Sequence, residues 1–159
     1  MALNIIYRGK DAYAPQVLAK PIALEDELER KDHFTVKNGV TCAGTHLIID
    51  LWDASQLDDL SRMESALREA VDVCGATLLH IHLHHFTPNG GISGVAVLAE
   101  SHISVHSWPE RGFAAFDAFM CGDAQPELAV DVFRRHFMPS RVEVQQHLRG
   151  TVGSHHGAV

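Results

Sequence analysis

Cysteine, basic charge and long apolar runs are all scarce in this sequence, and each shortage excludes a class of protein. The three cysteines are Cys42, Cys74 and Cys121, and no two of them form a C-x-x-C pair. A disulfide framework and a cysteine zinc site are therefore not expected. No run of about 18 apolar residues occurs, so we expect no membrane-spanning helix and no membrane partner. Because Arg8 and Lys10 interrupt the N-terminus too early for a signal-peptide core, we expect a cytoplasmic protein.

Basic residues are outnumbered, with 13 lysines and arginines against 20 acidic residues and a formal net charge of −7 at pH 7. Bulk charge of this sign does not favour a nucleic-acid partner. The 159 residues suffice for one domain with its own core, and 46% apolar and 21% charged residues are ordinary for a globular protein. Histidine, by contrast, is abundant, and most of the 12 residues cluster at His80, His82, His84, His85, His102, His106, His155 and His156.

The chain divides by pattern into three parts. Residues 1–40 show little periodicity and are predicted to be an N-terminal extension, with a short helical piece at Leu24–Arg30 and a turn at Lys37–Gly39. Residues 41–150 carry regular apolar periodicity and form the predicted domain. Residues 151–159 are predicted to be a flexible tail.

Within the domain, alternating and helical patterns predict strands at 45–52, 77–86, 92–98, 103–106, 113–120 and 141–148, and helices at about 57–70 and 127–137. The order β-α-β-β-β-β-α-β predicts an α+β two-layer sandwich, in which an antiparallel sheet packs on helices. Strand–helix–strand segments near both ends suggest an internal pseudo-repeat. Ser55 or Asp53 is expected to cap the first helix, and Gly75 to follow its end.

Alternating histidines mark the second predicted strand. The apolar face is expected to carry Leu79, Ile81 and Leu83, and the other face His80, His82 and His84. Histidines at this spacing can bind zinc, but no cysteine or carboxylate accompanies them at a known zinc spacing. Solvated histidines are therefore favoured, and no metal is expected.

The segment His84–Asp123 gathers serine, histidine, glutamate and cysteine around a turn. Taken singly, its polar residues have ordinary structural explanations. Taken together, the run A-E-S-H-I-S-V-H-S-W-P-E at Ala99–Glu110 resembles the processing site of bacterial and archaeal S-adenosylmethionine decarboxylases. So do Ser93-Gly94 before it and Phe119–Gly122 after it. The resemblance extends from about residue 44 to about residue 150.

The resemblance implies self-cleavage between Glu100 and Ser101. In that family the serine hydroxyl attacks the preceding carbonyl, the resulting ester is eliminated to dehydroalanine, and hydrolysis leaves a pyruvoyl group. Ser101 would thus become the covalent cofactor, with a β chain of residues 1–100 and an α chain starting at the former Ser101. The substrate amine would form a Schiff base with the pyruvoyl carbonyl, and S-adenosylmethionine would lose CO₂ to give the aminopropyl donor for spermidine.

Further roles are implied by position within the signature. Ser93 corresponds to the serine that steadies the oxyanion during processing, and His106 to the histidine that accepts the Cα proton, a role that suits imidazole at neutral pH. Cys121 corresponds to the thiol that returns a proton to the substrate.

Substrate-binding residues are implied in the same way. Phe86 corresponds to an aromatic residue that stacks on adenine, and an aromatic face also favours the sulfonium. Glu110 corresponds to the acid that binds the ribose hydroxyls, and Trp108 is expected to line the same pocket. The family also implies a homodimer of αβ units, with sites at the interface.

Departures from the family pattern leave alternatives open. The turn Pro88–Gly91 is one residue longer than the family pattern, Ser107 replaces the commoner threonine, and Arg111 replaces a tyrosine or similar residue. One alternative is a pyruvoyl-dependent arginine or ornithine decarboxylase of the same fold, since specificity depends on the pocket. Another is a non-cleaving homologue that acts as a binding partner.

Overall fold

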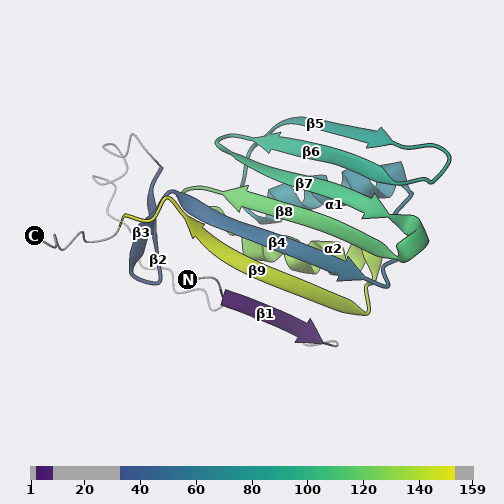
Figure 1. The fold of residues 1–159 in the computed structure, drawn as a ribbon. Helices are drawn as coiled ribbons and strands as arrows, with labels where there is room; N and C mark the ends of the chain where they lie inside the picture. The colour runs from purple at the N-terminus through teal and green to yellow at the C-terminus, as the bar shows by residue number, and fades with distance from the viewer. Residues whose placement is uncertain (1–2, 9–32, 153–159) are drawn as a thin grey trace, which may run out of the picture.

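The computed structural model describes residues 3–8 and 33–152, which form a seven-stranded sheet and a two-stranded hairpin (Figure 1). The strand order of the sheet is β1-β9-β4-β8-β7-β6-β5, and all neighbouring strands are antiparallel. The strands are β1 (Leu3–Arg8), β2 (Thr35–Lys37), β3 (Val40–Cys42), β4 (Gly44–Trp52), β5 (Leu78–His85), β6 (Ile92–Leu98), β7 (Ser101–Trp108), β8 (Phe113–Met120) and β9 (Arg141–Arg149).

Two helices, α1 (Leu60–Val73) and α2 (Ala129–Phe137), cover one face of this sheet (Figure 1). Short 3-10 turns, η1 (Pro109–Arg111) and η2 (Pro126–Leu128), precede β8 and α2. The core forms where alternate, buried strand positions meet the helices, and the Phe116 ring stacks on that of Phe133 at 4.1 Å between centroids. No helix in the described part of the chain covers the other side of the sheet, which we call the open face.

The predicted α+β two-layer architecture is confirmed, because β4 to β9 follow the order β-α-β-β-β-β-α-β. The two predicted strand–helix–strand segments, β4-α1-β5 and β8-α2-β9, each join strands that run in the same direction. Three strands separate β4 from β5, whereas only β4 separates β8 from β9. The segments are therefore alike in local motif and differ in their spacing within the sheet.

The predicted cap of α1 is wrong. Asp59 is the N-cap, and its carboxylate accepts a hydrogen bond from the backbone N–H of Arg62 at 2.9 Å. Ser55 instead lies in the preceding loop, where its backbone N–H and its hydroxyl both donate to the carbonyl of Phe137. The helical pattern began too early because Leu57 is fully buried although it lies before the helix. Gly75 follows the helix with a φ of 72°, as predicted.

One predicted face of β5 is also corrected. Leu79 is 65% exposed, because the register of β5 against β6 shifts between Leu78 and His80. Leu78 packs against the core in its place, together with Ile81 and Leu83. A bulge of this kind moves a side chain to the other face without changing the composition of the strand.

Additional strands lie in or beside the predicted extension. β1 pairs with β9 at the sheet edge, and β2 pairs with β3 around Asn38 and Gly39, where a turn was expected. Val152 forms an isolated bridge with Thr41. The helical piece expected at Leu24–Arg30 and residues 153–159 of the expected tail lie outside the described residues. The boundaries 1–40, 41–150 and 151–159 stay predictions.

Among the described residues, no helix has both the length and the apolar character needed to cross a membrane. The cytoplasmic location stays a prediction.

Candidate active site

The predicted cleavage junction lies in the tight turn between β6 and β7. Leu98, the last residue of β6, pairs with Ser101, the first residue of β7, which leaves Ala99 and Glu100 as the turn. Glu100 has a φ of 64°, in the left-handed region that favours glycine or asparagine. A non-glycine residue held there stores strain of order 1–3 kcal/mol. The peptide bond predicted to break therefore follows a strained residue.

Cys121, directly after β8, contacts both sides of this junction. Its thiol donates to the carbonyl oxygen of Glu100 at 3.3 Å, and its backbone N–H donates to Ser101 Oγ at 3.2 Å. Burial and the negative charge of Glu100 raise the pKa of the Cys121 thiol above its ordinary value. The thiol therefore keeps its proton at neutral pH, as a proton donor must.

A cavity of about 490 Å³ adjoins the junction, and its lining includes Glu100, Ser101, Cys121 and His33. His33 Nδ1 lies 3.0 Å from a carboxylate oxygen of Glu100, and the His33 carbonyl accepts from the backbone N–H of Gly122 at 3.2 Å. His33 thus places an imidazole beside the glutamate at the predicted cleavage site.

A second pocket, of about 340 Å³, lies at the opposite end of the sheet. Its lining includes all five of the remaining predicted site residues: Phe86, Ser93, His106, Trp108 and Glu110. Ser93 and His106 are direct partners across β6 and β7, and Ser93 Oγ lies 2.8 Å from His106 Nδ1.

Backbone hydrogen bonds fix the long turn that brings Phe86 into this pocket. The Phe86 N–H donates to the Gly91 carbonyl, and the Gly90 N–H donates to the Phe86 carbonyl, both at 2.8 Å. Ser107 supports the same end of the sheet, because its buried hydroxyl accepts from the Ile92 N–H and donates to the Leu57 carbonyl. Both hydrogen bonds are made by the hydroxyl group, which serine shares with the threonine that is commoner at this position in the family.

The two groups of site residues do not meet within one chain. Ser101 and His106 are five residues apart on the same strand, β7, which corresponds to about 17 Å at roughly 3.3 Å per residue. Figure 1 shows the β6–β7 turn at one end of the sheet and the β5–β6 connection at the other. The structure therefore brings Glu100, Ser101 and Cys121 together, and separately Ser93 and His106.

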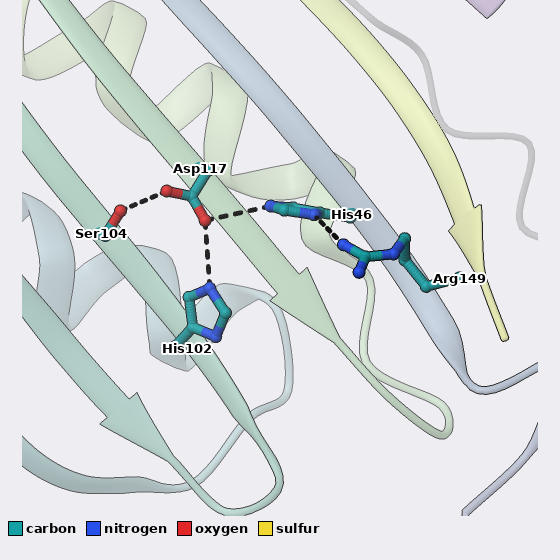
Figure 2. A network of polar contacts seen from close by, with 5 residues as sticks. All are labelled: His46, His102, Ser104, Asp117 and Arg149. Carbon is teal, nitrogen blue, oxygen red and sulfur yellow. Dashed lines mark hydrogen bonds and ion pairs between the residues drawn. The ribbon is translucent and has the colours of Figure 1, made fainter. Parts of the chain in front are cut away.

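A polar network lies on the open face (Figure 2), and one of its members, His102, directly follows Ser101. Asp117 Oδ2 lies 3.1 Å from Nε2 of both His46 and His102, and its Oδ1 accepts from the Ser104 hydroxyl. Arg149 reaches Nδ1 of His46 at 3.0 Å. Partial burial raises the pKa of Asp117, but hydrogen bonds from Ser104, His46 and His102 outweigh it, so the net pKa lies below its ordinary value.

Ligand atoms of His46, His102 and Asp117 all lie within 4.8 Å of one another, close enough to share a metal ion. Among the described residues, this is the group of three that meets this distance, and the strand-face histidines His80, His82 and His84 are not part of it. Those three side chains are exposed, in keeping with solvated histidines.

Comparison with known proteins identifies the family. The sequence profile described as S-adenosylmethionine decarboxylase matches residues 45–150. The chain belongs to the S-adenosylmethionine decarboxylase family. It is 44% identical over 110 residues to the S-adenosylmethionine decarboxylase proenzyme of Thermomicrobium roseum, covering 69% of this chain and 95% of that protein. Identity to the proenzyme of Methanococcus aeolicus is 46% over 112 residues, with coverage of 69% and 95%. The crystal structure of the adenosylmethionine decarboxylase from Aquifex aeolicus matches with a TM-score of 0.65 at 32% identity, covering 74% of this chain and 98% of that one.

The site residues that sequence reasoning missed lie partly inside and partly outside the region that matches the S-adenosylmethionine decarboxylase profile. His46, His102 and Asp117 lie inside the matched region. His102 directly follows Ser101, and Asp117 lies four residues before Cys121, so this short spacing to predicted site residues was an available signal. His33 lies before the matched region, in a segment without clear periodicity. No sequence signal placed it beside Glu100.

Proposed function

We propose that this chain cleaves itself between Glu100 and Ser101 and then decarboxylates S-adenosylmethionine, using a pyruvoyl group made from Ser101. Membership of the S-adenosylmethionine decarboxylase family supports the reaction class. The observation that carries the self-cleavage is the double contact of Cys121 with the Glu100 carbonyl and the Ser101 hydroxyl.

Cleavage begins at a carbonyl that is already polarised, because the Cys121 thiol donates to it. Ser101 Oγ adds to the Glu100 carbonyl carbon, the peptide C–N bond breaks, and the hydroxyl proton ends on the freed amine. A base then removes the Ser101 Cα proton and the Cβ–O bond breaks, which releases Glu100 as a carboxylate. Water finally replaces the nitrogen, which leaves as ammonia.

His106 is the proposed base, and Ser93 the proposed donor to the oxyanion of the first step. Ser93 Oγ lies 2.8 Å from His106 Nδ1, so the two side chains are oriented as a pair. An imidazole can accept a proton near neutral pH.

The residues at the junction suit a pyruvoyl group at position 101. The adjoining cavity of about 490 Å³ gives room beside Ser101, and the Cys121 thiol carries a proton there because burial raises its pKa. Such a group supplies a ketone that binds the substrate amine and accepts the electrons left when CO₂ departs. Cys121 then returns a proton to the substrate Cα.

The pocket that includes Phe86, Trp108 and Glu110 is the proposed site for the nucleoside. Its volume of about 340 Å³ lies within the usual range for ligand pockets. Phe86 and Trp108 are 48% and 41% exposed, so part of each aromatic side chain is open to contact with adenine and the positive sulfonium. Glu110 offers carboxylate oxygens to ribose hydroxyls.

The separation of the two groups of residues supports the proposed homodimer of αβ units. Cys121, which follows β8, lies beside Ser101 at the start of β7, whereas His106 lies toward the other end of β7. The proposed reaction nevertheless uses both side chains at Ser101. A two-fold symmetric pair of chains can place one end of each sheet against the other end of its partner, and so complete two sites.

Intact-mass measurement under denaturing conditions is the deciding experiment. We expect a β fragment ending at Glu100 and an α fragment lighter by ammonia than one starting with serine. Release of CO₂ from carboxyl-labelled S-adenosylmethionine, arginine and ornithine then identifies the substrate. Preferred release from arginine or ornithine would contradict the substrate assignment, and a chain that stays intact on long incubation would favour the non-cleaving alternative.

A further inference from the structure

The Asp117 network on the open face spans four strands, β9, β4, β8 and β7 (Figure 2). On β7 it includes His102, which directly follows Ser101. Asp117 on β8 is paired directly with Ser104 on β7, and it reaches diagonally to His102 on β7 and His46 on β4. Phe119, between the two histidines, contacts their rings at centroid distances of 5.8 and 6.0 Å. Packing and hydrogen bonds therefore fix both imidazoles in place.

The contact from Arg149 argues against a metal ion as the purpose of this cluster. A guanidinium only donates hydrogen bonds, so Nδ1 of His46, 3.0 Å away, must accept. The ring proton of His46 is then on Nε2, directed at Asp117. A histidine that binds a metal through Nε2 would carry its proton on Nδ1, facing the donors of Arg149. The geometry therefore favours a closed hydrogen-bond network.

Cleavage would give this network a second role. Ser101 is the first residue of β7, and β6, its partner, belongs to the other product chain. If residue 101 loses its nitrogen as ammonia, His102 becomes the first residue of the α chain with a backbone N–H. Free chain ends fray unless they are tied down. The hydrogen bond from His102 to Asp117 is a side-chain contact that cleavage leaves intact.

The same network connects the two product chains. His46 belongs to residues 1–100, whereas His102, Ser104 and Asp117 belong to residues 101–159. Asp117 also lies on the strand that leads directly into Cys121. A side chain that holds His102 against β8 thus sets the position of residue 101 relative to the thiol.

We propose that Asp117, supported by His46 and Ser104, positions His102, and through it the cofactor-bearing residue 101, against Cys121. This inference rests on the proposed function. His102 and Asp117 are positioning residues in it, because neither is required to touch the substrate.

Two substitutions of similar size test the role of the donor at His102. Glutamine in His102→Gln keeps an N–H group close to the position of Nε2, whereas His102→Leu keeps bulk without a donor. We expect His102→Gln to retain the wild-type extent of cleavage and kcat within about threefold. We expect His102→Leu to lower kcat about 10- to 100-fold, the loss of one hydrogen bond to a charged group, with KM nearly unchanged. His80→Gln and His80→Leu, on an exposed position of β5, are the matched controls.

Asp117→Asn provides an independent variant if His102→Leu does not fold by circular dichroism, and the same fall in kcat is expected. Equal kcat for the Gln and Leu variants, beside an active wild type, would overturn the inference. So would a stoichiometric metal ion in the wild type that His102→Gln loses. A wild type that neither cleaves at Glu100 nor releases CO₂ would instead overturn the proposed function.

Discussion

The thiol of Cys121 donates a hydrogen bond to the carbonyl oxygen of Glu100 at 3.3 Å. The same side chain is therefore in place for two tasks of the proposed function. Before cleavage it polarises the carbonyl that Ser101 attacks, and after cleavage it is the proton donor beside residue 101. Glu100 would by then end in a carboxylate, whose added negative charge further disfavours a thiolate.

Ser101→Ala removes the hydroxyl that attacks the Glu100 carbonyl. We expect a single chain of full length and no decarboxylation, with the fold intact, because Ser101 is only partly buried at the edge of a turn. Intact mass and circular dichroism check the two parts of this prediction. A variant that is cut normally after Glu100 would remove Ser101 from its assigned role.

Cys121→Ala separates cleavage from turnover. The strained turn and the backbone N–H of Cys121 remain, so we expect partial cleavage. Loss of a general acid lowers kcat by about 10²- to 10⁴-fold. Steady-state kinetics on the cleaved fraction measures this effect, and unchanged turnover would exclude Cys121 as the proton donor.

The negative charge of Glu100 should lower the rate at which the Cys121 thiol is alkylated. Burial and then Glu100 raise the pKa of this thiol, so Glu100→Gln should lower that pKa and speed alkylation by iodoacetamide near pH 8. Both proteins carry Ser101→Ala to remain uncut. Cys42 and Cys74 are buried, and burial raises the pKa of Cys74 to about 12, so labelling reports on Cys121. Glu110→Gln, in the other pocket, should leave the rate unchanged; an equal increase there would contradict a local charge effect.

Sequence reasoning correctly predicted the strands and helices whose apolar pattern is regular. β6 and β8 begin and end at the predicted residues, and both predicted helices are present. It failed where a contact distant in sequence decides the structure. Leu79 is displaced by a bulge in its pairing with β6, and Ser55 is held by the carbonyl of Phe137 rather than by the helix it precedes.

The candidate site was predicted as a set of residues and not as an arrangement. Ser101 and His106 are five positions apart in the signature. Only the structure shows that both lie on one strand, β7, and therefore toward opposite ends of the sheet. His46, His102 and Asp117 come together because β4, β8 and β7 are neighbours, which is a property of the sheet order. The position of His33 beside Glu100 could not be predicted, because His33 lies in a segment without a periodic pattern.

Complementation tests whether two chains share each site. In a co-expressed pair, His106→Ala supplies an intact Cys121 and Cys121→Ala supplies an intact His106. With equal expression and random pairing, half the dimers contain one of each, and each such dimer has one complete site, so about a quarter of wild-type activity is expected. Separately expressed variants are the controls. Activity no higher than the sum of these controls would mean that each chain completes its own site.

Acid stability should depend on Asp117 in a defined direction. Hydrogen bonds lower the pKa of the folded-state carboxyl below the reference value of 3.8, so its stabilising contribution is complete above that pH and lost as pH falls through the lower, folded-state value. Asp117→Asn should therefore lower Tm at pH 7 and 5, and the difference should shrink below pH 3.8. Asp50, on β4, is the control of opposite sign, because burial and Glu143 raise its pKa. Asp50→Asn should leave Tm unchanged or higher at neutral pH, and an equal loss of Tm in both variants would show that the network contributes no specific stabilisation.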